Sequence, residues 1–116
     1  MRAIINGVEG GNLELFKGSD QTWVLLLTND DGSALNLTGD TITLSFYDFN
    51  DKRNAALFTV TASLVTAAAG LCSAVISAAN SALLGAGATV YAHALRNAGG
   101  AGAYTYGQKS ASVLVR

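Results

Sequence analysis

The stretch TITLSFY, residues 41–47, decides the fold class. Its apolar members Ile42, Leu44 and Phe46 alternate with hydroxyl residues. Successive side chains of a β-strand point to opposite faces, so this alternation predicts a strand with one buried and one exposed face. Residues 58–64 repeat the pattern. The sequence therefore predicts at least two half-buried strands.

Two turn signals lie close together just before this stretch. Residues 29–32 are Asn-Asp-Asp-Gly and residues 39–40 are Gly-Asp, and these residue types tolerate a positive φ. The short segment 35–37 between them, Leu-Asn-Leu, is expected to tuck its leucines inward. Such closely spaced turns favour the corner of a β-sandwich over a helical connection.

Further strands are expected on both sides of this corner. The segment 23–28 is apolar on both faces, which predicts a central strand packed on two sides. The remaining candidates are residues 13–16, 71–77, 90–95, 104–108 and 111–115. About seven to eight short strands with frequent turns predict an all-β antiparallel sandwich.

The alanine-rich region 66–84 is the ambiguous part of the chain. Gly70 interrupts a helical pattern, and Leu71 onward alternates as a strand. Ser77 is expected to cap a short helix over residues 78–84 that ends at Gly85. One long helix across the region is the alternative interpretation.

The length of the chain is typical of a single domain. We expect one domain over residues 1–116, within which residues 1–12 could form an N-terminal arm. The chain contains no proline. Because proline often protects exposed sheet edges, an edge open to pairing with another chain is expected.

Charge is distributed unevenly along the chain. Residues 1–53 carry a net charge of −4 and residues 54–116 carry +3, and no Asp, Glu, Lys or Arg lies between Arg53 and Arg96. Scattered basic residues and a net charge of −1 argue against nucleic acid as a partner. Polar residues interrupt the uncharged stretch too often for a membrane span. An undercharged surface of this kind is expected to be covered by a protein partner.

Few residues suggest chemistry. His93 is the only histidine and lacks the neighbours of a zinc site or a catalytic triad, so we interpret it as a strand residue at a surface or interface. Cys72 is the only cysteine and is interpreted as a small buried apolar residue. No catalytic, cofactor-binding or metal-binding residue is assigned, and the protein is expected not to be an enzyme.

Three other patterns have alternative interpretations. Asp30, Asp31, Asp48 and Asp51 could meet a calcium ion, but without EF-hand spacing they are interpreted as solvated turn residues. The glycine-rich segment 99–102 lacks the residues of a phosphate loop and is interpreted as a hairpin tip. The five aromatic residues that could form a sugar-binding face are instead attributed to core and sheet packing; they are Trp23, Tyr47, Tyr91, Tyr104 and Tyr106.

The chain as a whole resembles the small immunoglobulin-like domains of tailed-bacteriophage virions, found at the start of baseplate upper proteins and in head-fibre or decoration proteins. The resemblance is carried by the segments 13–20 (LELFKGSD), 29–32 (NDDG) and 35–39 (LNLTG), and by Ile76 to Ala78 with Leu83, Leu84, Gly87 and Tyr91. Ser19 interrupts the family's "KGD" pattern, Asn36 replaces the Asp of "DLTG", and the proline expected before Gly87 is missing.

The resemblance implies an immunoglobulin-like sandwich and a non-enzymatic structural role in a virion. It implies attachment to a capsid or tail protein and self-association, with a homotrimer favoured, and no membrane partner. Within that class we expect a capsid decoration, cement or head-fibre base protein, because the chain carries no long extension beyond the domain. The alternatives are a tail or baseplate adaptor and a carbohydrate-binding adhesin module.

Overall fold

The computed structural model describes residues 2–9, 13–48, 56–85, 87, 89–97 and 105–116. The backbone alone is described for residues 9, 48, 89 and 105–111. The earlier assignments at residues 51, 99–102 and 104 lie outside the described residues.

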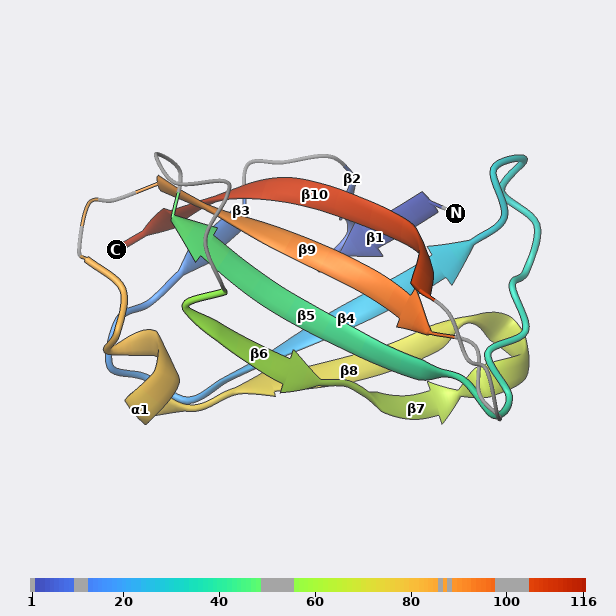
Figure 1. Cartoon of the computed structure of the whole chain (residues 1–116), viewed down its shortest axis with the longest axis horizontal. Coiled ribbons are helices and arrows are strands. Elements are labelled where there is room, and N and C mark those ends of the chain that lie inside the picture. Colours follow the sequence, from blue (N-terminus) through green and yellow to red (C-terminus); the bar gives the residue numbers. More distant parts are fainter. Residues whose placement is uncertain (1, 10–12, 49–55, 86, 88, 98–104) are drawn as a thin grey trace.

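The described residues form ten strands, one short α-helix and one 3-10 turn (Figure 1). The strands are β1 (Arg2–Ile5), β2 (Val8–Glu9), β3 (Leu13–Leu15), β4 (Gln21–Thr28), β5 (Thr41–Asp48), β6 (Phe58–Thr61), β7 (Ser63–Thr66), β8 (Leu71–Ile76), β9 (Thr89–Asn97) and β10 (Thr105–Val115). The helix α1 spans Ala78–Ser81, and the 3-10 turn η1 spans Ala67–Ala69.

The strands form two packed sheets. The first sheet has the order β2-β1-β4-β8-β7, and the second has the order β3-β10-β9-β5-β6. Pairing is antiparallel except between β3 and β10, which run parallel. With immunoglobulin lettering, β1, β4, β8 and β7 occupy the A, B, E and D positions, and β10, β9 and β5 occupy G, F and C. The expected immunoglobulin-like β-sandwich is therefore confirmed, although the described residues form ten strands where about seven to eight were expected. β6 lies beyond C as an added edge strand.

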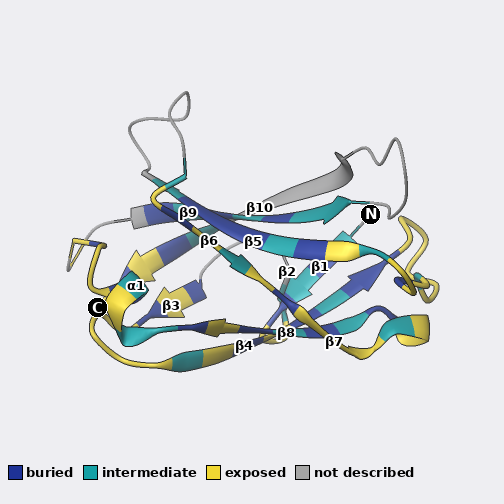
Figure 2. Ribbon diagram, turned by 60° about the horizontal axis from the view of Figure 1, so that its bottom comes forward, coloured by how far each residue is buried: buried dark blue, intermediate teal, exposed yellow. Residues whose placement is uncertain are grey.

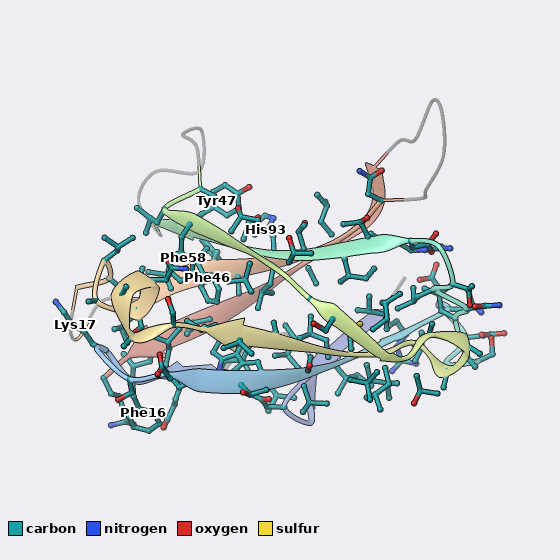
Figure 3. All side chains as sticks on the ribbon, turned by 90° about the horizontal axis from the view of Figure 1, so that it is seen from below. Phe16, Lys17, Phe46, Tyr47, Phe58 and His93 are labelled. Carbon is teal, nitrogen blue, oxygen red and sulfur yellow. The ribbon has the colours of Figure 1, made fainter. Side chains whose placement is uncertain are left out.

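The core lies between the two sheets and follows the alternation that the sequence predicts. Ile42, Leu44 and Phe46 of β5 are fully buried. The Phe46 ring stacks on Phe58 of β6 at a centroid distance of 4.5 Å and meets Trp23 of β4 edge to face at 5.5 Å. These aromatic contacts join three strands from both sheets, and Figure 3 shows Phe46 and Phe58 between the layers.

The predicted corner between β4 and β5 is confirmed. Gly32 has a φ of 86°, and its amide donates to the Asn29 carbonyl at 2.9 Å. Asn36 then orders the second turn, because its Oδ1 accepts hydrogen bonds from the Thr38 amide at 3.0 Å and the Thr38 hydroxyl at 2.7 Å. Leu37 is fully buried, as expected. The two turns carry the chain from the first sheet to the second.

The turn of residues 17–20 is hydrogen-bonded to the helix α1. The Asp20 carboxylate accepts a hydrogen bond from the Ala78 amide at 2.6 Å, and the Gly18 amide donates to the buried Ser81 hydroxyl at 2.9 Å. Ser77 caps α1 as predicted, accepting from the Asn80 amide at 3.1 Å. The helix ends earlier than expected, at Ser81 instead of Leu84. The chain continues as a tighter turn, in which the Leu84 amide donates to the Ser81 carbonyl at 3.2 Å.

Two other expectations are corrected. Residues 2–5 are not part of an arm: β1 pairs with β4, and Ala3 and Ile5 lie in the core. The apolar run over residues 3–5 has no alternation that could have indicated this strand. The single strand expected over residues 58–64 divides at Ala62, where the chain crosses from the second sheet to the first.

The segment 23–28 is a central strand, but the prediction that it packs on two sides is wrong. Trp23, Leu25 and Leu27 are buried, whereas Val24 is 48% exposed on the opposite side. Within the described residues, no second layer covers this side of the first sheet (Figure 2).

Candidate interaction surfaces

The outward side of the first sheet is apolar, and we call it the apolar face. Its two central strands, β4 and β8, present the outward residues Thr22, Val24, Leu26, Leu71, Ser73 and Val75. Val24 and Val75 are 48% and 59% exposed. Outward residues of a sandwich are ordinarily polar, so this composition is unusual.

The apolar side chains of this face are contiguous across three strands. Ile4 of β1 lies opposite Leu26 of β4, which in turn lies opposite Leu71 of β8. Val24 lies opposite Ser73, and Val75 lies opposite Thr22, which makes the two valines diagonal neighbours. Among the described side chains that β1, β4 and β8 turn outward, only Arg2 is charged. The face therefore offers apolar area together with very little charge to desolvate.

The outward side of the second sheet has a different character. Tyr47 of β5 lies opposite Tyr91 of β9, and the Tyr47 ring is 4.7 Å from the His93 ring. Figure 3 shows Tyr47 and His93 together on the outer side of this sheet. Ser45 and Thr59 are neighbours on adjacent strands, and their hydroxyl oxygens are 2.9 Å apart. We call Tyr47, Tyr91 and His93 the aromatic patch.

The surroundings of His93 favour its neutral form. The side chain is half-buried on β9, and desolvation lowers the pKa of its imidazole below the ordinary value of 6.5. The neutral ring presents a polarisable face next to Tyr47. The position agrees with the interpretation of His93 as a strand residue at the surface of a sheet.

Charged pairs lie at the margins of the sandwich. Arg96, near the end of β9, forms an ion pair with Asp40, which precedes β5, with an Nε to Oδ2 distance of 2.6 Å. Arg116 reaches Glu14 of β3 at 2.9 Å. Both pairs connect strand ends of the second sheet, so neither places charge on the apolar face.

Cys72 and Trp23 are core residues, as interpreted from the sequence. Cys72 is fully buried in β8, and burial raises the pKa of its thiol to about 11. Trp23 is 2% exposed, so it belongs to the core and cannot join the aromatic patch. The side chain of Tyr106 is not described.

The turn aspartates are solvated, as far as they are described. Asp31 accepts hydrogen bonds from the Ser33 hydroxyl at 2.6 Å and the Ser33 amide at 2.9 Å, which lower the pKa of its carboxyl. Among the described residues, no group of three or more His, Cys, Asp or Glu side chains could hold a metal ion. The side chain of Asp48 is not described.

Comparison with known proteins finds no family model that matches this chain, and no curated protein matches its sequence. None of the helices in the described part of the chain is long and apolar enough to cross a membrane.

The sequence contained a signal for the apolar face, but its interpretation was wrong. A strand that is apolar at nearly every position either packs on two sides or leaves one apolar side outward. The uncharged stretch after Arg53 supplies β8, and β4 supplies the neighbouring strand. Their pairing, which joins residues about fifty positions apart, creates the face.

Proposed function

We propose that this protein is a non-enzymatic structural component of a tailed-bacteriophage particle, which docks on the capsid through its apolar face and associates with further copies of itself. The observation that carries the proposal is the pairing of β4 with β8, which turns Val24, Val75 and their apolar neighbours outward. The choice of a phage particle as the partner rests on the resemblance of the chain to the immunoglobulin-like domains of virions.

The composition of the face suits a permanent protein contact. Burying aliphatic side chains stabilises a complex by about 25 cal/mol for each square ångström of apolar area removed from water. Hydroxyl groups on Thr22 and Ser73 are small enough to let a flat partner approach closely. Because few charges take part, the contact should persist at high salt, whereas an interface built on ion pairs would weaken.

The test is co-purification with particles of the phage whose genome encodes the chain. Particles are banded in a caesium chloride gradient, separated into heads and tails, and probed for the protein. Recovery with heads, undiminished by washing in molar salt, is the expected result. Recovery with tails would favour the adaptor alternative. Absence from both fractions would contradict the virion role.

A specific observation also supports a second candidate, carbohydrate binding. The aromatic patch places two tyrosine rings on neighbouring strands beside a neutral imidazole. Aromatic faces of this kind pack against the apolar faces of sugar rings. A glycan array provides the test, with a Tyr47→Ala and Tyr91→Ala double variant as the control. Binding that this variant retains would contradict the candidate, and so would a lack of any hit with the native chain.

A further inference from the structure

The four strands at the sheet edges differ in how they are protected against pairing with another chain. Among the described strands, β2 and β7 are the edges of the first sheet, and β3 and β6 are the edges of the second. Exposed edges are commonly blunted by shortness, charge, proline or a bulge. β2 has two residues, and β3 carries Glu14 in its ion pair with Arg116. β7 has a register shift between Leu64 and Thr66. Each of these three edges has a protective feature.

β6 is also short, at four residues, but it lacks the charge, the proline and the register shift that protect an edge. Its sequence Phe-Thr-Val-Thr contains no charge and no proline, and all four residues pair with β5 in a regular register. Threonine, valine and phenylalanine are among the strongest strand formers. The open side of β6 is therefore a flat, uncharged strand edge.

The hydrogen-bond pattern shows which backbone groups of β6 point to the open side. The Ala62 amide donates to the Ile42 carbonyl directly opposite it, at 2.8 Å. Residues of an antiparallel ladder alternate between pairs that exchange hydrogen bonds and pairs that do not. Val60 therefore directs its backbone toward β5, whereas Thr59 and Thr61 direct their amides and carbonyls toward the open edge. Two donors and two acceptors are presented there.

This edge is complementary to itself. The sequence Thr59-Val60-Thr61 is the same in both directions, so a two-fold axis at Val60 places Thr59 of one copy opposite Thr61 of the other. Thr59 and Thr61 of each copy then both pair with the other copy, and four backbone hydrogen bonds form across the axis. The threonine side chains become cross-strand pairs, which are favourable in sheets. An edge strand carrying charge would instead repel its own copy.

We propose that two copies of this chain associate through β6, edge to edge and antiparallel, about a two-fold axis at Val60, to give one continuous ten-stranded sheet from the two second sheets. The proposal names the surface for the self-association included in the proposed function and rests on that part of it. The apolar face belongs to the other sheet, so it stays available for docking on a particle. The arrangement is a dimer, in contrast to the trimer that the resemblance implies.

The molar mass of the free chain is the first test. Light scattering behind a sizing column should give twice the chain mass of 11.8 kDa over a range of loading concentrations. A mass of one or three chains would overturn the β6 pairing. A trimer would leave the proposed virion role intact, because particle co-purification is measured separately.

A disulfide test locates the axis. Val60 of one copy faces Val60 of the other in a pair that exchanges no hydrogen bonds. The Cα atoms of such a pair lie about 4.5 Å apart, which is within the range that a disulfide spans. The Val60→Cys variant should therefore form a covalent dimer on mild oxidation. The native Cys72 is buried and does not interfere. Val65→Cys is the control, because Val65 is 60% exposed on β7 and five positions from the axis. Equal cross-linking of both variants, or none at Val60→Cys, would overturn the proposal.

A backbone variant tests the hydrogen bonds. Thr61→Pro removes one amide donor per copy from the open edge and removes no bond to β5, and proline is tolerated at the edge of a sheet. Loss of two of the four bonds should weaken the dimer on the order of 10- to 100-fold. The control is Thr61→Val, which keeps the amide donor at residue 61 and should dimerise normally. Thr22→Pro is unsuitable as a control, because β4 is a central strand. A folded Thr61→Pro chain with unchanged dimer affinity would overturn the proposal.

Discussion

Replacing the two exposed valines of the apolar face with threonine should separate docking from folding. Val24 and Val75 are 48% and 59% exposed, so Val24→Thr and Val75→Thr should change the free energy of unfolding by less than about 0.5 kcal/mol each. Threonine has nearly the same shape as valine and a similar preference for strands. Each substitution replaces one methyl group of an outward side chain with a hydroxyl group.

The effect should appear when the face is covered. A hydroxyl group buried against a partner without a hydrogen bond costs about 1 to 3 kcal/mol. If the proposed docking is correct, the double variant should bind the particle with a dissociation constant raised on the order of 30-fold or more, since every 1.4 kcal/mol is a factor of ten. Co-sedimentation of the folded variant with particles stripped of the native protein measures this change.

Leu114→Thr is the matched control. Leu114 is an exposed apolar residue of β10, at 38%, but it belongs to the second sheet. This variant should dock with native affinity. Native docking of the double valine variant, or an equal loss in the Leu114→Thr control, would refute the assignment of the apolar face as the docking surface.

Three further predictions concern the fold itself. Gly70→Ala should lower the free energy of unfolding by about 3 kcal/mol or more in urea titrations, because Gly70 has a φ of 77° and an added Cβ would overlap the Leu27 carbonyl oxygen; a loss below 1 kcal/mol would mean that the approach is looser. The free energy of unfolding should fall as the pH drops through about 6.5 toward the lowered pKa of folded His93, because the unfolded chain takes up the proton first. His93→Gln should lack this pH dependence between pH 7 and 5, and an identical dependence in the variant would contradict the assignment to His93. Cys72, with a pKa of about 11, should react with a thiol reagent at pH 8 only at the rate of unfolding, and fast labelling of the native protein would contradict its burial.

The sequence predicts the sandwich because the relevant signals are local. Alternation over residues 41–47 fixes which face of β5 is buried, and the two turns before it need only Asn, Asp and Gly at the right positions. Ser77 likewise caps α1 through a contact three residues away. Signals of this range can be recognised in a single sequence.

The features that were missed depend on distant parts of the chain. β1 joins the first sheet by pairing with β4, and the chain leaves the second sheet for the first at Ala62. The apolar face requires the register that places Val24 beside Ser73. The sequence shows that the segment 23–28 is apolar on both faces, but it carries no information on whether a second layer covers Val24.

The aromatic patch shows the same limit. Tyr47 and Tyr91 are forty-four positions apart in the sequence and directly opposite each other in the sheet. Their separation in the sequence favoured the interpretation of core and sheet packing over a shared surface. Trp23 did prove to be a core residue, whereas Tyr47 and Tyr91 lie on the outer side of the second sheet.

The most direct measurement of the proposed virion role is a cryo-electron microscopy reconstruction of the phage particle on which we propose that this chain docks. Density for the sandwich is expected on the capsid, with the outward side of β4 and β8 against the shell and the aromatic patch toward solvent. Particles that lack the chain, or that carry it with Val24 and Val75 facing solvent, would contradict the account.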